Sequence, residues 1–481
     1  MRRSAPAGSS RCTDLHLTVP RLLVAGLRGG SGKTLLSLGL AASFRSRGLV
    51  VAPFKKGPDY IDASWLSRAS GRHCRNLDLF LFPPATALTS FARGAEGADI
   101  AVVEGNRGLF DGMDAEGTFS SGELAKLLKA PVILSVDVTK TTRTAAAMVL
   151  GCQAMDPDVN LAGVILSRTA GARHESVLRQ SMEGITGVPV LGAIPKLPED
   201  LLPERHLGLV PPQEREETEG PLSRVGQVAE KYLDMEQILE VARTAAPLEI
   251  PGNGALASKD PTRVSRGTRP PRIGVFMDAA FQFYYPENLE ALVDAGAELV
   301  EISPLEPGKL PPVDGLYLGG GFPETLAPGL SGNPSFLTSV RERAEEGLPI
   351  YAECGGAVYL GNALHYEGET FRMAGVFPVE YGFQPRPRGH GYTVLETVAD
   401  NPFFPVGRNL RGHEFHYTYL MSPDADELDF AFKVHRGTGF GSQRDGLKRK
   451  NVLASYSHIH ALGAEGWASS LVRAAARFTS P

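Results

Sequence analysis

Short apolar runs alternate with helical patterns along most of the chain, and they fall into two series. The first series lies at Arg21–Gly26, Val50–Phe54, Ile100–Glu104, Val132–Val136, Ala162–Leu166 and Val190–Ile194, with a helical pattern over Lys33–Arg47. The second lies at Arg272–Met277, Leu299–Ile302, Gly315–Leu318 and Pro349–Ala352. Strands that are apolar throughout are buried on both faces, so each series predicts a parallel sheet covered by helices in an α/β fold.

The two series are separated by a segment rich in Pro, Gly, Ser and Thr that has no apolar period. A chain of 481 residues is also longer than one hydrophobic core usually serves. We therefore predict a flexible leader over residues 1–20, a first domain over 21–243, a linker over 244–271 and a second domain over 272–481.

Composition and charge exclude several classes of function. The net charge is −5 and no block of Lys or Arg follows a phosphate backbone, so we expect no nucleic-acid partner. No apolar stretch is long enough to span a membrane. The four cysteines, Cys12, Cys74, Cys152 and Cys354, form no metal-binding or redox pair, which predicts a cytoplasmic location.

Cys354 carries the strongest signal for catalysis. It follows the buried strand that begins at Pro349 and precedes Gly355 and Gly356, so the thiol is expected on a tight turn at a helix start. The amide groups there are expected to lower the thiol pKa and, with an amide of Gly319–Gly321 such as that of Gly320, to hold an oxyanion. A second apolar run ends in His458, and a thiol with a distant histidine predicts nucleophilic acyl chemistry.

A glycine loop follows the first predicted strand of the chain. The amides of Gly29, Gly30, Ser31 and Gly32 would surround a polyphosphate, Lys33 would reach its outer phosphates and Thr34 would bind Mg²⁺. The spacing differs from the strict P-loop, with five residues between Gly26 and Gly32. The loop resembles the variant found in dethiobiotin synthetase and the partitioning ATPases, where a lysine often stands at the position of Arg28.

Acidic and basic side chains follow the next strands of the first series. Glu104 ends one of them, as the second metal-binding carboxylate of a nucleotide site commonly does. Lys55, Lys56, Asp59 and Asp62 fall within ten residues, where lysines would hold an anionic group and carboxylates a metal. A solvated strand end and a charged surface turn would give the same pattern.

Several ordered motifs together resemble the cobyrinic acid a,c-diamide synthase family. They are Lys55–Asp62, Asn76–Asp78, Glu104–Gly112, Pro203–Leu209, Ala280–Asn288, Gly319–Glu324, Glu353–Gly356 and Gly412–Tyr417. The resemblance implies a P-loop NTPase-like first domain, related to dethiobiotin synthetase, and a class I glutamine amidotransferase second domain. It also implies a ligase of cobalamin biosynthesis that uses ATP, Mg²⁺, L-glutamine and an anionic tetrapyrrole to convert two acetate carboxylates into amides through acyl phosphates.

The resemblance also implies roles for single residues. Thr34 and Glu104, with Asp59 or Asp62, would bind metal, and Asp111 would join the catalytic acids. His458 would hold the thiolate and protonate the departing ammonia. His460 would replace the acid that orients this histidine in many class I glutaminases. A packed histidine is the alternative at position 460, and His413 and His416 are expected to be structural or interfacial.

Two departures from the family pattern leave the substrate open. Ser167 and Arg168 stand where relatives commonly carry an asparagine near adenine, and Arg107 stands where many have a small or apolar residue. The same diamidation of sirohydrochlorin, its nickel chelate or sirohaem is therefore an alternative. A partitioning-type ATPase switch with an inactive glutaminase is a more remote one, and a homodimer is possible.

Overall fold

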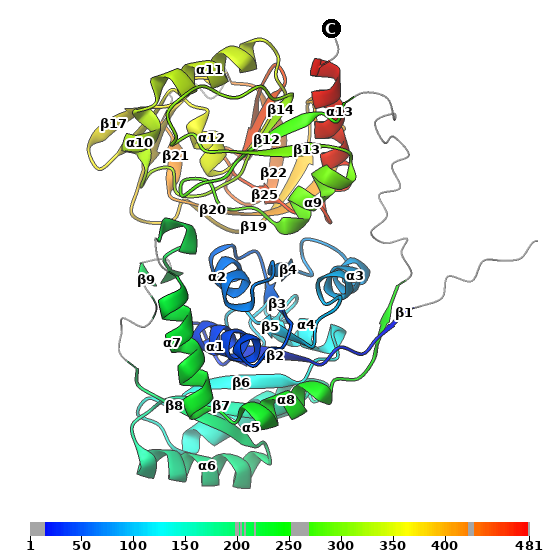
Figure 1. Ribbon diagram of the computed structural model, residues 1–481, viewed down its shortest axis with the longest axis vertical. Coiled ribbons are helices and arrows are strands. Elements are labelled where there is room, and N and C mark those ends of the chain that lie inside the picture. Colours follow the sequence, from blue (N-terminus) through cyan, green and yellow to red (C-terminus); the bar gives the residue numbers. More distant parts are fainter. Residues whose placement is uncertain are drawn as a thin grey trace, which may run out of the picture.

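The computed structural model describes residues 15–197, 202, 204–205, 208–215, 218–251, 269–421 and 428–479. These form two α/β domains that lie one above the other along the longest axis (Figure 1). Three parts of the predictions lie outside the described residues: the leader up to residue 14, the linker from 252 to 268, and Pro203, His206 and Leu207 of one family motif.

The first domain is built on a seven-stranded sheet in which every neighbouring pair is parallel. Its order is β4 (Arg75–Leu77), β3 (Val51–Lys56), β5 (Ile100–Glu104), β2 (Arg21–Gly26), β6 (Val132–Asp137), β7 (Leu161–Thr169) and β8 (Val190–Pro195). The six predicted strands are confirmed, and β4 was not predicted because three residues give too short a pattern. The parallel order brings the carboxyl ends of β3, β5 and β2 side by side, where the phosphate loop begins.

Helices cover both faces of this sheet, as the apolar strands require. One face carries α1 (Lys33–Ser46), α2 (Ile61–Ser70), α7 (Glu219–Tyr232) and α8 (Met235–Arg243). The other carries α3 (Pro84–Gly94), α4 (Ser121–Leu127), α5 (Arg143–Met155) and α6 (Ala172–Thr186). A short pair, β9 (Glu204–Arg205) and β10 (Gly208–Leu209), and the turn η1 (Pro212–Glu214) precede α7.

The ends of the predicted leader and linker are ordered, which corrects both boundaries. β1 (Leu15–Leu17) pairs antiparallel with β11 (Leu248–Ile250), so structure begins before Arg21 and continues past residue 243. The buried Arg21 guanidinium ties the two segments to the first domain, donating to the Leu128 carbonyl at 2.6 Å and also to the Ala246 carbonyl. Composition did not show this pairing because it joins segments over two hundred residues apart.

The second domain contains a ten-stranded mixed sheet. Its parallel part is β13 (Glu298–Ile302), β12 (Arg272–Phe276), β14 (Gly315–Leu318), β15 (Ile350–Glu353) and β24 (Val452–Ser455). The antiparallel part continues with β23 (Arg444–Arg449), β22 (Phe430–Arg436), β19 (Gly389–Thr397), β20 (Asn409–His416) and β25 (His458–Ile459). The four predicted strands of the second series are confirmed within the parallel part.

A smaller sheet and five helices complete the described part of this domain. The sheet has the order β17 (Glu369–Arg372), β16 (Ala363–Tyr366), β18 (Glu380–Phe383) and β21 (Thr418–Leu420). The helices are α9 (Pro286–Asp294), α10 (Ala327–Ser331), α11 (Pro334–Glu345), α12 (Gly355–Tyr359) and α13 (Trp467–Thr479). No helix in the described ranges combines the length and the apolar character that crossing a membrane requires.

The antiparallel part of the large sheet curls back on itself. Only two residues separate β24 from β25, yet β25 pairs with β20 at the far end of the sheet order. The strand β20 is thereby brought over the carboxyl end of β15, where Cys354 lies. The fold thus assembles one site from strands that are distant in the chain.

Candidate active sites

The phosphate loop joins β2 to α1. Gly32 is the residue before the helix and has a φ of 84°, a left-handed conformation that favours glycine. The Lys33 ammonium donates to the Arg28 carbonyl at 3.0 Å, and the Ser31 hydroxyl donates to the same oxygen at 2.6 Å. Gly29 to Thr34 therefore lie on one loop and the first helical turn, as the motif predicted.

A cluster of one ammonium and three carboxylates lies beside this loop. Lys55 Nζ is 2.6 Å from Asp62 Oδ2, 2.7 Å from Glu104 Oε1 and 3.8 Å from Asp59 Oδ2. The Thr34 hydroxyl donates to Glu104 Oε1 at 2.8 Å. The structure thus brings together five residues that the sequence analysis singled out, because strands β3 and β5 are direct neighbours.

Burial and the Lys55 ammonium set the charges in this cluster. Burial raises the pKa of Glu104 even though Lys55 opposes the shift. Burial also acts to raise the pKa of Asp62, but contact with Lys55 outweighs it and the pKa is lowered. Burial and the neighbouring Asp62 raise the pKa of Asp59 to about 7. Asp59 can therefore exchange a proton near neutral pH, whereas Asp62 stays ionised.

The oxygen atoms of the cluster fit a small divalent cation. Glu104 Oε2 is fully buried and has no hydrogen-bond partner among the residues that the structure describes, so it retains an unused acceptor. No group of three or more His, Cys, Asp or Glu side chains arranged as a complete metal site occurs among the described residues. Hydroxyl and carboxylate oxygens such as those of Thr34 and Glu104 suit Mg²⁺ when nucleotide phosphates and water supply the other ligands.

Asp111 and Lys56 lie at the edge of this site. The Gly108 amide donates to Asp111 Oδ2 at 2.8 Å, so this exposed carboxylate shapes the loop after β5 rather than joining the Lys55 cluster. With Arg107 and Met155 it lines an open hollow. Lys56 is buried, and burial lowers its pKa although Asp78 opposes the shift.

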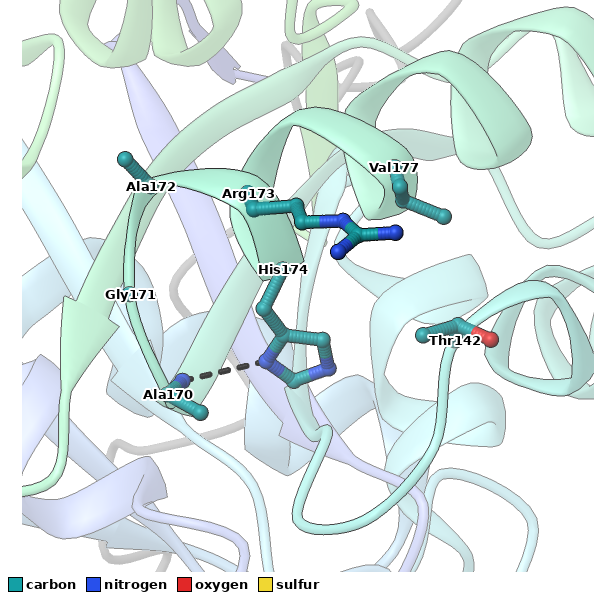
Figure 2. A pocket seen from close by; sticks show the side chains of 7 residues that line it. All are labelled: Thr142, Ala170, Gly171, Ala172, Arg173, His174 and Val177. Carbon is teal, nitrogen blue, oxygen red and sulfur yellow. Dashed lines mark hydrogen bonds between the residues drawn. The ribbon is translucent and has the colours of Figure 1, made fainter.

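The loop after β7 takes its shape from an ion pair and a histidine. The Arg168 guanidinium lies 2.7 Å from Asp137 Oδ2, which Arg28 also contacts at 3.0 Å. Figure 2 shows the adjacent hollow, where His174 Nδ1 accepts from the Ala170 amide at 3.0 Å. Nε2 of that ring contacts the Thr141 carbonyl at 2.6 Å.

Cys354 lies on a strained turn between β15 and α12. Its φ of 48° and ψ of −105° are unfavourable for a side-chain-bearing residue and lift the thiol out of the sheet. The thiol contacts the Phe415 carbonyl of β20 at 3.7 Å. The expected lowering of its pKa is wrong for this state, because burial and then the charge of Glu324 raise the thiol pKa, and the Gly355 amide only partly opposes them.

Gly320 brings the thiol and His458 together. A Cβ built at Gly320 would lie 2.4 Å from His458 Cε1, 3.1 Å from His458 Nε2 and 3.4 Å from Cys354 Cβ, so both side chains converge on this backbone. The Gly319 amide donates to the Tyr284 hydroxyl at 2.7 Å and is not available to an oxyanion. The oxyanion roles of the Gly320 and Gly355 amides stay a prediction.

The structure does not bring His460 to His458, which corrects the expected orienting pair. His458 Nδ1 lies 3.6 Å from Glu353 Oε2, whereas His460 Nε2 lies 3.6 Å from Glu287 Oε2. The chain turns away after β25, since the amides of Gly463 and Ala464 both donate to the His460 carbonyl. Sequence reasoning missed Glu353, although an acid at the end of an apolar strand beside the predicted nucleophile was a usable signal.

Tyr60 lies between the site around Lys55 and the site around Cys354 and His458. This side chain precedes α2 in the first domain, and its ring centroid lies 5.3 Å from that of His458 and 5.5 Å from that of His413. His413 stacks on His458 at 4.9 Å, so the two histidines of the second domain lie together against Tyr60 of the first. Figure 1 shows α2 and β4 on the side of the first domain that faces α9 and β20. The ion pair from Arg75 of β4 to Glu287 of α9, at 3.2 Å, links the same surfaces.

Comparison with known proteins identifies both domains. Residues 22–210 match the CobQ/CobB/MinD/ParA nucleotide binding domain, and residues 272–466 match the CobB/CobQ-like glutamine amidotransferase domain. The two matches agree with the two predicted fold types and with the division of the chain seen in the structure.

Relatives similar over almost the whole chain share one name. The cobyrinate a,c-diamide synthase of Magnetococcus marinus is 46% identical over 95% of this chain and 97% of its own length. That of Archaeoglobus fulgidus is 39% identical over 96% of this chain and 98% of its own length. Among solved structures, PurLQS from Thermotoga maritima covers 44% of this chain and 99% of its own at 15% identity, with a TM-score of 0.34.

Proposed function

The chain belongs to the cobyrinate a,c-diamide synthase family, a family of glutamine-hydrolysing ligases, and we propose that it amidates the a- and c-acetate carboxylates of cobyrinic acid. One observation supports the proposal above all. The Lys55–Glu104 cluster beside the phosphate loop and the Cys354–His458 pair lie in different domains, yet Tyr60 touches His458 and neighbours Asp59. Two half-reactions can therefore proceed on either side of one side chain.

The first domain would activate the carboxylate. A carboxylate oxygen attacks the γ-phosphorus of ATP. The bond from that phosphorus to the bridging β-phosphate oxygen breaks, ADP departs, and the carboxylate becomes an acyl phosphate. Lys33 and the loop amides would offset the charge on the transferring group. Thr34 and Glu104 would hold Mg²⁺, which when bound neutralises phosphate charge. Lys55 keeps Asp62 and Glu104 in place at hydrogen-bond distance.

The second domain would release ammonia from glutamine. The Cys354 thiol passes its proton to His458 as sulfur attacks the amide carbon, and His458 returns the proton to nitrogen as the carbon–nitrogen bond breaks. Water then hydrolyses the thioester to glutamate. Ammonia forms the new carbon–nitrogen bond at the acyl phosphate, phosphate leaves, and nitrogen loses a proton.

The substrate assignment is tested by comparing tetrapyrroles directly. Purified protein is incubated with ATP, Mg²⁺, glutamine and either cobyrinic acid, sirohydrochlorin, nickel sirohydrochlorin or sirohaem, and the products are weighed by mass spectrometry. We expect cobyrinic acid to lose mass in two steps, each equal to the difference between OH and NH₂. Efficient diamidation of another macrocycle, with none of cobyrinic acid, would move the assignment to that substrate.

The division of labour is tested separately with a Cys354→Ala variant. It should lose glutamine-dependent amidation but amidate normally with ammonium salts, because the acyl phosphate forms in the other domain. Failure of ammonia to restore the product would show that the two half-reactions are not separate. The near full-length similarity to synthases favours this ligase over a partitioning-type switch. A homodimer and a cytoplasmic location stay predictions.

A further inference from the structure

We propose that Glu353 is the carboxylate that positions His458, so that the orienting acid stands directly before the nucleophile in the chain. The inference rests on the proposed glutamine hydrolysis. It replaces the role first expected of His460 and makes Glu353 a positioning residue, since it acts on the reaction only through the histidine.

Glu353 is held rigidly by donors. It ends β15 with its side chain fully buried. Oε1 accepts from the Ile459 amide at 3.0 Å and from the Tyr351 hydroxyl at 3.1 Å. Oε2 accepts from the Tyr317 hydroxyl at 3.2 Å. An ionised carboxylate only accepts, so these three donors match its two oxygens.

His458 presents a different ring nitrogen to each neighbour. Nδ1 faces Glu353 Oε2 at 3.6 Å and has no hydrogen-bond partner within the described part of the chain. Nε2 lies on the edge that meets Gly320, next to Cys354. A small rotation of the ring would turn the Nδ1 contact into a hydrogen bond while the Nε2 edge stays against Gly320, next to Cys354. This is the arrangement in which an acid fixes the tautomer of a general base.

His460 is committed to other contacts. Its Nδ1 accepts from the Leu462 amide at 3.2 Å, which places the proton on Nε2, toward Glu287. Its ring packs 4.4 Å from that of Tyr285. Burial, with the charge of Arg75, lowers the pKa of His460 to about 3, so it stays neutral. Its ring also lies 4.7 Å from that of Phe82 in the first domain, so His460 serves the contact between the domains.

The position of Glu353 matters because the thiol is not ionised beforehand. Burial raises the Cys354 pKa, so the nucleophile starts as a thiol. Proton transfer to Nε2 as sulfur attacks creates a cation on His458 in a site without bulk water. A carboxylate at Nδ1 offsets that cation and keeps the ring aligned until the proton passes to the leaving nitrogen.

The test compares Glu353→Gln with the wild type in two assays. We expect the kcat for glutamine hydrolysis to fall by about 100-fold or more, with a much smaller change in KM for glutamine. Amidation supported by ammonium salts should be unchanged, which would show that the fold and the first domain are intact. Glu353→Asp should retain more activity than Glu353→Gln because the charge remains.

Two variants separate positioning from packing. Tyr351→Phe removes one donor to the same carboxylate, and His460→Gln removes the residue first expected in the role. In each of these variants, the fold decrease in kcat should be at least about ten times smaller than in Glu353→Gln. In ¹⁵N-histidine-labelled protein, the His458 signals, identified with a His458→Gln variant, should show Nδ1–H in the wild type and lose that preference in Glu353→Gln.

The outcomes are distinguishable. If the wild type hydrolyses glutamine and Glu353→Gln keeps its kcat and tautomer, the inference is overturned and the proposed function stands. A larger loss in His460→Gln than in Glu353→Gln would return the role to His460. If the wild type hydrolyses no glutamine in the presence of its other substrates, the proposed function itself fails.

Discussion

The ring of Tyr60 in the first domain lies 5.3 Å from the ring of His458 in the second, so the glutaminase histidine is covered by a residue of the synthetase site. Tyr60 stands between Asp59 and the helix that carries Asp62, both within 4 Å of Lys55. Any movement of this segment on substrate binding therefore changes the contact between the rings of Tyr60 and His458.

Replacing Tyr60 should uncouple the two half-reactions. In Tyr60→Ala the lost ring opens the space between the sites, so ammonia escapes and more glutamate forms for each amide made. Tyr60→Phe keeps the ring and is the matched control. Glutamate and diamide are measured in the same reaction mixture. An unchanged ratio in Tyr60→Ala would show that Tyr60 does not seal the interface.

Removing the buried ammonium should destabilise the first domain. Lys55→Met leaves Asp62 and Glu104 without their partner, at a cost of about 3–5 kcal/mol at neutral pH. Because Lys55 lowers the Asp62 pKa, this stabilisation is lost as pH falls through that pKa, and the difference from wild type should shrink in acid. Urea unfolding at several pH values measures this difference in the free energy of unfolding.

The control for this change is an ion pair at the surface. Arg47 lies 2.7 Å from Glu230, with about a third of each side chain exposed, so Arg47→Met should cost about 1 kcal/mol or less. Equal losses in the two variants would contradict the role assigned to burial.

A methyl group at Gly320 should stop glutamine hydrolysis. The added Cβ of Gly320→Ala would meet His458 Cε1 at 2.4 Å and push the imidazole away from the thiol. Ammonia-dependent amidation should survive, since the first domain is untouched. Gly184→Ala is the control, because a Cβ there meets nothing within 4 Å and lies in helix α6. Retained glutaminase activity in Gly320→Ala would show that the loop adapts.

Glu324 should make stability depend on pH. Burial raises its pKa from 4.5 to about 7, so the folded protein binds a proton that the unfolded chain has released between these values. The free energy of unfolding therefore falls as pH rises through this window. Glu324→Gln should abolish this pH dependence, which lowers the free energy of unfolding by at most about 3 kcal/mol between pH 4 and pH 8. If the free energy of unfolding changed with pH in the same way in the variant and the wild type, the raised pKa of Glu324 would be contradicted.

The sequence alone was sufficient for features that depend on neighbours in the chain. Apolar runs determined the parallel strands, glycine spacing determined the phosphate loop, and Cys354 was identified by the strand and turn around it. That charged residues at the ends of β3 and β5 share one site was implied by the family resemblance, which placed Glu104 and Asp59 or Asp62 on one metal.

The tertiary structure decided what depends on distant segments and on solvent. Curling of β20 and β25 over β15 set Glu353, not His460, beside His458, although both acid and histidine were visible in the sequence. Packing of the domains placed Tyr60 on His458, and burial raised the thiol pKa against the pull of the local amides. Contacts and desolvation are properties of the whole fold, and no local pattern contains them.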